Sequence, residues 1–354
     1  MSGTASGKEK HREGPIAGQL PAEIAAQGCL GAPIPEEYGG KGLDMRAWGR
    51  LCEAAGKISL ARAGLYTVHG MVSRAILRWG TAAQRERWLP LMAKGKVIGA
   101  FALSEAQAGS DAGNVETAAA RTGNSYSLTG VKKWVSFGEA AGVTLVIART
   151  IEGLSAFLVE KDTPGLTCVT INGMLGMRES MLSELHLAQA IVPGENLLGA
   201  EGFGFSAVAQ SALDFGRYSV AWASLGIARA CLEETIALAA GSPGSRGNSL
   251  IEGALAEMAA EVEAAGLLCL KAGFSREHGD PASIRDACMA KYFASRTAMK
   301  CADDALRLSG LAGCSSGSPL ERYFRDAKAL EIIEGTSQVL EILIGSSSSF
   351  FRES

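Results

Sequence analysis

The order of secondary-structure signals along the chain constrains its fold more than any other feature of the sequence. Residues 16–98 carry apolar residues at helical spacing, and Asp44 and Thr81 stand where they can cap helices. From about Val97 the segments become short and rich in β-branched residues, which is typical of strands. The helical period returns at Phe203 and persists. Helices, then strands, then helices do not give the β–α alternation of a doubly wound parallel sheet, so a Rossmann fold is disfavoured.

This order predicts an α+β protein that is mostly helical. Long helices joined by short connections indicate a bundle in the C-terminal part. Its fourth helix is interrupted at 334–336, where Thr336 or Ser337 can cap the segment that follows. The predicted parts are a disordered tail at 1–15, an N-terminal helical domain at 16–98, a middle antiparallel β-sheet or barrel domain at 99–198, and a C-terminal four-helix bundle at 199–354.

Composition and charge exclude several classes of protein. The 354 residues have a formal net charge of −3 and no basic block, which disfavours a nucleic-acid partner. The eight cysteines form no CxxC pair and the four histidines lie far apart, so we expect no metal site and no dense disulfide framework. No apolar run reaches the ~18 residues of a membrane span, and the first residues lack the apolar core of a secretory signal. We therefore expect a soluble cytoplasmic protein that does not contact a membrane.

Three segments suggest chemistry. Residues 101–111, FALSEAQAGSD, leave a strand and enter a Ser/Gly-rich loop, whose backbone N–H groups suit a phosphate or a polarised ring edge. Residues 132–138, KKWVSFG, place a tryptophan beside a serine at a strand end, where the indole can stack on a flat cofactor. Residues 321–339 break a helix at Glu334, and an apolar setting there would raise the pKa of its carboxyl and suit a base. Taken singly, a polar loop, a core tryptophan and a solvent-exposed glutamate remain the alternatives.

Taken together and in this order, the three segments resemble the acyl-CoA dehydrogenase family. FALSEAQAGSD resembles the family's flavin loop, usually written LTEPxxGSD, and KKWVSFG resembles its second flavin-contacting strand. RDAKALEIIEGTSQV resembles the catalytic-glutamate segment. Further matches are PEEYGGKGLD at 35–44, LDFGR at 213–217 and MAKYFAS at 289–295. The resemblance covers about residues 19–345 and implies the same helix–sheet–helix fold.

The resemblance implies a flavin-dependent oxidation of an acyl thioester. Members of the family bind FAD non-covalently and dehydrogenate the acyl group between Cα and Cβ. Glu334 is then the base that removes the α-proton, and the β-hydride passes to flavin N5. The backbone N–H of Glu334 and a ribityl hydroxyl of the flavin would stabilise the developing enolate oxygen. Some relatives place the base where this chain has Gly216, which leaves Glu334 as the only good candidate.

The resemblance also assigns binding residues and exposes two departures. The family's RxxFG motif, whose arginine reaches the flavin pyrophosphate of a neighbouring subunit, is missing from 237–247. That Arg246 substitutes for it from a shifted position is a hypothesis. Arg307 replaces the glutamine of the family's QxxGG motif, and our hypothesis is that it supplies the missing positive charge. The other implied flavin contacts are Phe101, Leu103, Ser104, Gly109, Ser110, Trp134, Ser136, Thr336, Ser337 and Gln338. The implied substrate contacts are Ser110, Asp214, Arg217 and Gly335.

Several alternatives stay open at this stage. The acyl group is carried either by coenzyme A or by an acyl carrier protein, as in the polyketide branch of the family, because both carriers present the same phosphopantetheine thioester. A flavin oxidase or monooxygenase, or a non-catalytic flavoprotein, would use the same fold. An electron-transfer flavoprotein is the expected electron acceptor, and assembly as a homodimer or homotetramer is expected from the resemblance.

Overall fold

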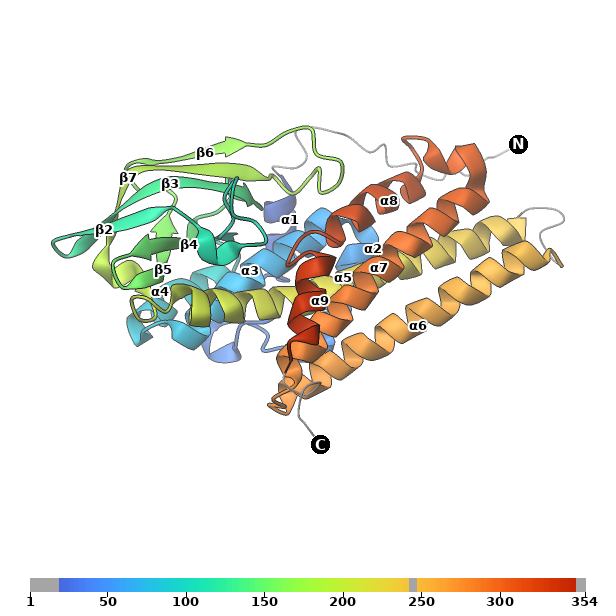
Figure 1. Cartoon of the computed structure of the whole chain (residues 1–354), viewed down its shortest axis with the longest axis horizontal. Coiled ribbons are helices and arrows are strands. Elements are labelled where there is room, and N and C mark those ends of the chain that lie inside the picture. Colours follow the sequence, from blue (N-terminus) through green and yellow to red (C-terminus); the bar gives the residue numbers. More distant parts are fainter. Residues whose placement is uncertain (1–18, 242–246, 348–354) are drawn as a thin grey trace.

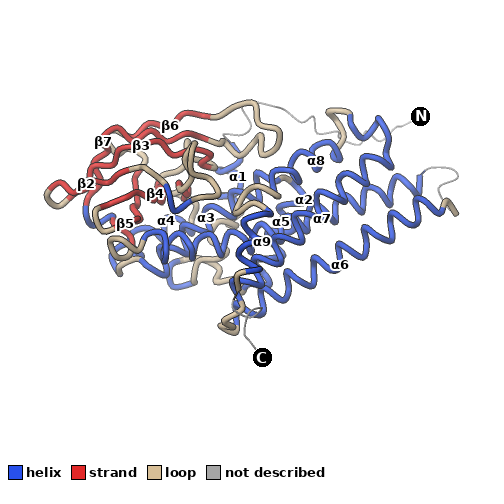
Figure 2. Tube along the Cα trace, viewed as in Figure 1, coloured by secondary structure: helices blue, strands red, loops and turns tan. Residues whose placement is uncertain are grey.

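A computed structural model of the chain describes residues 19–241 and 247–347 (Figure 1). The predicted tail at 1–15 and Arg246 lie outside the described residues. Helices and strands are segregated, with the sheet at one end of the molecule and long helices running from beneath it to the other end (Figure 2). The mostly helical α+β fold predicted from the sequence is thereby confirmed.

The N-terminal helices begin where the sequence supplies capping side chains. Asp44 accepts a hydrogen bond from the backbone of Ala47 at 2.7 Å, and Thr81 forms a reciprocal capping box with Gln84. His69, which is buried, accepts a hydrogen bond from the backbone N–H of Gly99 at 3.2 Å and fixes the third helix against the first strand. These helices are α1 (Leu20–Ala26), α2 (Met45–Ile58), α3 (Leu60–Trp79) and α4 (Ala82–Ala93), with a 3-10 turn at Glu36–Tyr38.

The middle part is a sheet of eight strands. Its order is β6-β7-β3-β2-β4-β5-β8, with β1 paired to β4 off this path. A separate apolar cluster, in which the Tyr126 and Phe157 rings meet at 4.9 Å, lies on it. The strands are β1 (Gly99–Ala102), β2 (Ala118–Thr122), β3 (Ser125–Val135), β4 (Val143–Thr150), β5 (Gly153–Glu160), β6 (Leu166–Thr170), β7 (Ser183–Pro193) and β8 (Leu197–Leu198), with 3-10 turns at Ala112–Asn114 and Gly194–Asn196.

The prediction of a purely antiparallel sheet needs correction at β4. Five strand pairs are antiparallel, as expected, but β1 runs parallel to β4, with Gly99 opposite Val143, and β2 meets β4 in parallel at Ala118 and Arg149. The chain leaves β1 through a long connection before it reaches β4, and a connection of that length lets the later strand return in the same direction.

The C-terminal part is a helical bundle with one modification. The long apolar stretch from Phe203 begins as a turn of π-helix at Gly204–Ala209 before α5 continues it. The interrupted fourth helix is two helices, because the chain turns at 331–336 and α9 then packs across α7 (Figure 1). The helices are α5 (Gln210–Gly241), α6 (Ser249–Glu277), α7 (Ser283–Ser309), α8 (Pro319–Leu330) and α9 (Ser337–Gly345), with a 3-10 turn at Gly310–Cys314.

Two contacts join the parts around the turn between α8 and α9. Helix α5 packs against both α3 and α7, so it connects the N-terminal helices to the bundle. The loop between β6 and β7 reaches α8, where the backbone N–H of Met177 donates to the buried carboxylate of Asp326 at 3.0 Å. The turn that contains Glu334 lies where α3, α5 and α7 come together, because Gly216 of α5 lies against Glu334 beside Met71 of α3, and Lys291 of α7 bonds Gly335.

None of the helices at 19–241 and 247–347 is long and apolar enough to cross a membrane. In the same ranges no group of three or more His, Cys, Asp or Glu side chains is arranged to hold a metal ion.

Candidate active site

The turn between α8 and α9 gives Glu334 an unusual backbone conformation. Glu334 has φ 55° and Gly335 has φ 98°, so two successive residues are left-handed. This conformation costs a side-chain-bearing residue free energy, and such residues concentrate at functional sites. The sequence offered Thr336 or Ser337 as the cap of α9, and it is the hydroxyl of Thr336 that accepts a hydrogen bond from the backbone N–H of Val339 at 3.3 Å.

The Glu334 carboxyl group packs against Gly216 of α5, beside Met71 of α3. The residue as a whole is partly exposed, but its Oε2 is shut off from solvent and has no hydrogen-bond partner in the described chain. A Cβ added at Gly216 would lie 2.3 Å from that Oε2 and 2.8 Å from the sulfur of Met71. Burial raises the pKa of Glu334 to about 7, although Arg217 and Lys291 act in the opposite direction. A carboxyl group with this pKa can take up a proton near neutral pH.

Two buried cations hold the backbone of the same turn. Arg217 of α5 donates from Nε to the carbonyl oxygen of Glu334 at 3.3 Å. Lys291 of α7, which is completely buried, donates from Nζ to the carbonyl oxygen of Gly335 at 2.6 Å. Arg217 was predicted as a substrate contact, whereas Lys291 was not singled out. Its only sequence signal is its place in the MAKYFAS segment.

The two segments predicted to contact the flavin lie side by side. The backbone N–H of Lys133 donates to the carbonyl oxygen of Ser104 at 2.9 Å. The buried Lys132 donates from Nζ to the carbonyl of Leu103 at 2.9 Å and to Glu105 Oε1 at 2.7 Å. The loop after β1 is thus attached to the end of β3.

The carboxylate of Glu105 organises the loop that follows β1. It accepts hydrogen bonds from the backbone N–H groups of Glu116 and Thr117 and from the Thr117 hydroxyl at 2.6 Å. Burial alone would raise the pKa of Glu105, but these hydrogen bonds and the one from Lys132 outweigh burial and lower it to about 2. The group is therefore an anion at neutral pH that ties the loop to the sheet.

The residues present fit a flavin dinucleotide. Trp134 at the end of β3 is left-handed (φ 63°) and 47% exposed; Lys133 Nζ lies 5.0 Å from its ring centre, and the rest of the aromatic surface suits stacking. Gly109 has open space around it. The hydroxyl of Ser337, at the first residue of α9, is buried and has no partner in the described ranges, and a helix N-terminus of this kind suits a pyrophosphate.

The remaining predicted residues differ in their contacts and in their exposure to solvent. Asp214 pairs with Arg276 of α6 at 2.5 Å and precedes Arg217 on α5 by less than one turn. Leu103 is buried in the same apolar cluster that Phe101 and Ile333 border. Of the remaining residues, Ser104, Ser136, Gly335 and Thr336 are partly exposed, and Gly109, Ser110 and Gln338 are exposed.

Arg307 lies far from Glu334 within this chain. Its side chain is 66% exposed and pairs with Asp303 and Asp304, which lie one turn earlier on the same face of α7. It comes sixteen residues after Lys291 on that helix, which corresponds to about 24 Å at 1.5 Å per residue. A contact between Arg307 and a flavin therefore remains a hypothesis that needs either the far end of the cofactor or a second subunit.

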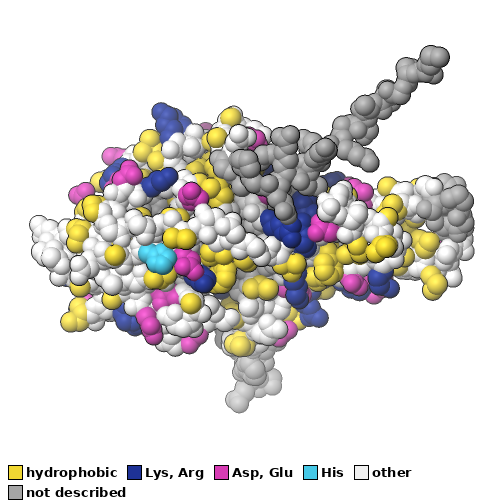
Figure 3. Space-filling view, turned by 90° about the horizontal axis from the view of Figure 1, so that it is seen from above, with side chains coloured by type: hydrophobic (Ala, Val, Ile, Leu, Met, Phe, Trp, Pro, Cys, Tyr) yellow, Lys and Arg dark blue, Asp and Glu magenta, His cyan; other side chains and the backbone are white. Residues whose placement is uncertain are grey.

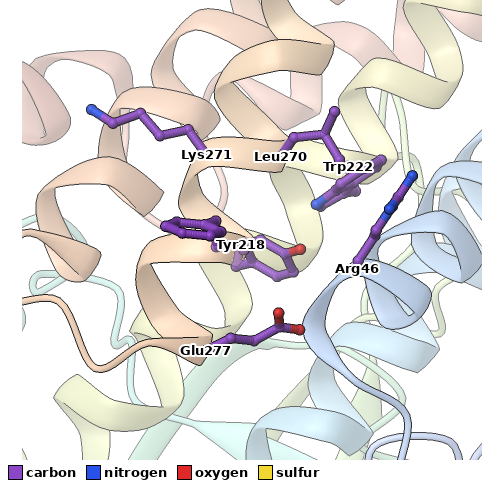
Figure 4. A pocket seen from close by; sticks show the side chains of 8 residues that line it. Arg46, Tyr218, Trp222, Leu270, Lys271 and Glu277 are labelled. Atoms are coloured by element: carbon purple, nitrogen blue, oxygen red, sulfur yellow. The ribbon is translucent and has the colours of Figure 1, made fainter.

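A hollow of about 490 Å³ between α2, α5 and α6 contains none of the predicted site residues. Figure 4 shows Tyr218 and Glu277 side by side in it. The Tyr218 hydroxyl donates to the carbonyl of Met45 at 2.7 Å, and Glu277 accepts from the backbone N–H of Met45 at 2.6 Å. Both side chains thus hold the start of α2.

The fold is that of an oxidoreductase of the acyl-CoA dehydrogenase type, and comparisons with known proteins agree with it. The N-terminal, middle and C-terminal domain models of acyl-CoA dehydrogenases match residues 5–96, 100–190 and 202–348. The chain therefore belongs to the acyl-CoA dehydrogenase family, whose members depend on FAD.

Individual relatives agree with this assignment. The chain is 38% identical to an acyl-CoA dehydrogenase of Bacillus subtilis, over 95% of this chain and 90% of that protein. The butyryl-CoA dehydrogenase structure from Megasphaera elsdenii matches with a TM-score of 0.90 and 33% identity, over 94% of this chain and 90% of that one.

Two less similar structures add a bound cofactor in one case and a different named substrate carrier in the other. A glutaryl-CoA dehydrogenase from Mycobacterium smegmatis, in complex with FADH2, has a TM-score of 0.88 and 29% identity, over 95% of this chain and 87% of that one. The prolyl acyl carrier protein oxidase AnaB has a TM-score of 0.86 and 28% identity, over 94% of this chain and 89% of that one.

Proposed function

We propose that this protein removes two hydrogens from Cα and Cβ of an acyl-CoA thioester and that Glu334 is the base. The observation that carries the proposal is the Oε2 of Glu334, which is buried, unpartnered in the described chain and attached to a group whose pKa is raised to about 7. A general base must be ionised to accept a proton, and it must also be basic enough to remove one. A pKa close to the working pH meets both needs.

The chain's own residues would act on the α-proton and on the thioester carbonyl. The Glu334 carboxylate takes the α-proton, the two electrons leave Cβ with the second hydrogen as hydride, and a Cα–Cβ double bond forms. Bound FAD supplies the acceptor for that hydride. The backbone N–H of Glu334 donates to no acceptor in the described residues, so it is available to the developing enolate oxygen. Gly216 leaves the space in which the carboxylate stands.

We assign the flavin to the surface between the sheet and α9. Trp134 would stack on the ring system, the loop 104–110 would contact the ring edge, and the N-terminus of α9 would face the pyrophosphate. Apart from Arg307, every predicted flavin contact belongs to β1, to the loop that follows it, to the end of β3 or to the start of α9: Phe101, Leu103, Ser104, Gly109, Ser110, Trp134, Ser136, Thr336, Ser337 and Gln338.

Replacement of Glu334 tests the base. We expect Glu334→Gln to keep the flavin spectrum while anaerobic bleaching by acyl-CoA slows by ~10²–10⁴-fold, the usual contribution of a general base. Glu341→Gln is the matched control, because Glu341 is a glutamate on α9 that bonds the Tyr292 hydroxyl at 3.0 Å. Bleaching of Glu334→Gln at the wild-type rate would exclude this role.

An acyl carrier protein thioester is the second candidate substrate. The likeness to prolyl acyl carrier protein oxidase supports it, although that protein is less similar than the acyl-CoA dehydrogenases. Anaerobic bleaching with short, long and branched acyl-CoAs and with loaded carrier proteins separates the two carriers. Peroxide formed during turnover in air would point to the oxidase alternative, whereas reduction of an electron-transfer flavoprotein would support a dehydrogenase.

We also propose that the protein assembles as a homodimer or homotetramer. Large apolar side chains are exposed along α6, where Leu267 is 60% and Phe274 is 62% exposed. Figure 3, which shows another face of the molecule, has hydrophobic side chains exposed over the helices as well as over the sheet. Leu267 and Phe274 are seven residues apart and so lie on the same face of α6, and exposed apolar faces are typical of subunit contacts. Sedimentation analysis of the flavin-loaded protein tests this assembly, and a monomer at micromolar concentration would contradict it.

A further inference from the structure

Lys291 is a charged side chain in a place where charge is costly. It lies in the middle of α7, has no exposed surface and is surrounded on its own helix by the buried small residues Ala287, Ala290 and Ala294. A lysine is almost never fully buried unless a partner holds it. Its partner is a main-chain oxygen, since Nζ donates to the carbonyl of Gly335 at 2.6 Å.

The carbonyl that Lys291 holds belongs to the turn that carries the base. The preceding carbonyl, that of Glu334, accepts a hydrogen bond from Arg217 at 3.3 Å. Two successive carbonyl groups are thus bound by cations from two different helices, α5 and α7. Glu334 and Gly335, which carry these carbonyl groups, are both left-handed, with φ 55° and 98°. Such a conformation persists only where the surroundings fix it.

Resting on the proposed role of Glu334 as base, we propose that Lys291 is a positioning residue, which fixes the left-handed turn at Glu334 and Gly335 and so directs the carboxylate toward the α-carbon of the substrate. Lys291 reaches the turn through a main-chain oxygen, so it acts without touching the substrate. Its positive charge adds a second effect, because it lies near enough to Glu334 to favour the ionised form of that carboxyl group.

The charged groups around Glu334 and Lys291 come from three elements: α5, α7 and the turn after α8. Arg217 on α5 and Lys291 on α7 both lower the pKa of Glu334. Lys291 in turn is affected by Glu334 and Glu331 in the turn after α8, by Arg217 on α5 and by Cys288 on its own helix. Burial lowers the pKa of Lys291 and raises that of Glu334, and the attraction between the two charges opposes both shifts. Met71, from α3, brings no charge.

The test compares Lys291→Met with Lys291→Arg and Lys300→Met. The first removes the donor and the charge but keeps the apolar stem, and the second restores both. Lys300 is the matched control, because it is a lysine on the same helix whose partners, Glu257 and Glu261, belong to α6. For each variant the rate of anaerobic flavin bleaching is measured from pH 5 to pH 9, together with flavin content.

On the acid side of the pH–rate profile (the acid limb), we expect the apparent pKa of flavin bleaching to rise by about one pH unit in Lys291→Met. This is the low end of the shift that a neighbouring charge produces. The rate at pH 6 then falls about tenfold beyond any loss at the plateau. Lys291→Arg is expected to return the limb toward its wild-type position. A limb that stays in place in Lys291→Met, with only flavin content or stability lowered, would reduce Lys291 to a packing role and overturn the proposal.

A titration that does not need turnover separates this proposal from the proposed function. The carbonyl stretch of the protonated Glu334 carboxyl group is followed by infrared difference spectroscopy against pH, and its absence in Glu334→Gln identifies the band. An upward shift of its midpoint in Lys291→Met but not in Lys300→Met supports the positioning role even if another group is the base. An unchanged midpoint contradicts it even if Glu334 is the base.

Discussion

Replacing Glu334 by glutamine should stabilise the folded protein at alkaline pH. The carboxyl group titrates at about 7 in the folded chain and at 4.5 as a model group. The folded state therefore binds more protons than the unfolded state between these values, and the free energy of unfolding falls as the pH rises through this window. Below pH 4.5 the contribution is complete, and above pH 7 it is lost. Glutamine has no charge to bury, so the variant avoids this loss.

The size of the effect follows from the difference between the two pKa values. A separation of about 2.5 pH units corresponds to about 3 kcal/mol at 1.36 kcal/mol per unit, which is an upper bound for a residue that is partly exposed. We expect Glu334→Gln to exceed wild type in unfolding free energy by up to this amount at pH 8 and by about zero at pH 4.5. The base would thus be held at the expense of stability, as is common at active sites.

Urea unfolding at pH 4.5, 6 and 8, with flavin and protein concentrations fixed, measures this difference. Glu105→Gln is the control with the opposite sign. The lowered pKa of Glu105, about 2, stabilises the fold above pH 4.5 and loses that effect as the pH falls toward 2. Its replacement should therefore destabilise the protein at pH 8. The reasoning is refuted if Glu334→Gln is less stable than wild type at pH 8, or if its advantage is the same at pH 8 and pH 4.5.

Three other substitutions have defined outcomes. Lys132→Met leaves the buried carboxylate of Glu105 without its charged partner, and urea unfolding should show a loss of about 3–5 kcal/mol; a loss below about 1 kcal/mol would contradict this. Gly216→Ala places a methyl group 2.3 Å from Glu334 Oε2, so stopped-flow bleaching should slow at least about tenfold while the flavin spectrum is kept, and an unchanged rate would argue against this contact. Thr336→Ala removes the cap of α9 and should cost about 1 kcal/mol in unfolding free energy, whereas Thr336→Ser should not.

Features set by local chemistry were predictable from the sequence. Asp44 and Thr81 were predicted as helix-capping positions, as was either Thr336 or Ser337. The side chains of Asp44, Thr81 and Thr336 each accept a capping hydrogen bond from the backbone. Capping depends on a few adjacent residues, so the sequence contains all that is needed. The order of helices and strands was predictable for the same reason, since periodicity is a property of each segment.

Features set by distant contacts were not predictable from the residues alone. The parallel pairing of β1 with β4 joins Gly99 to Val143, and no pattern within either strand specifies the direction of its partner. Lys291 has the sequence appearance of an ordinary helical lysine, because its burial depends on α5, α8 and α9 packing around α7. The roles assigned to Glu334 and to the flavin contacts stay predictions, and the closed space around Glu334 is what the structure adds to them.

The closeness of Gly216 to Glu334 has a consequence for how the site can change over generations. Any side chain larger than hydrogen at 216 would occupy the volume in which the Glu334 carboxylate stands. A base can therefore be carried by α5 or by the turn before α9, but not by both at once. A single substitution at either position passes through a chain whose carboxylate is displaced or absent. Moving the base thus requires two coordinated changes, and this barrier tends to preserve its position even when the acyl pocket diverges.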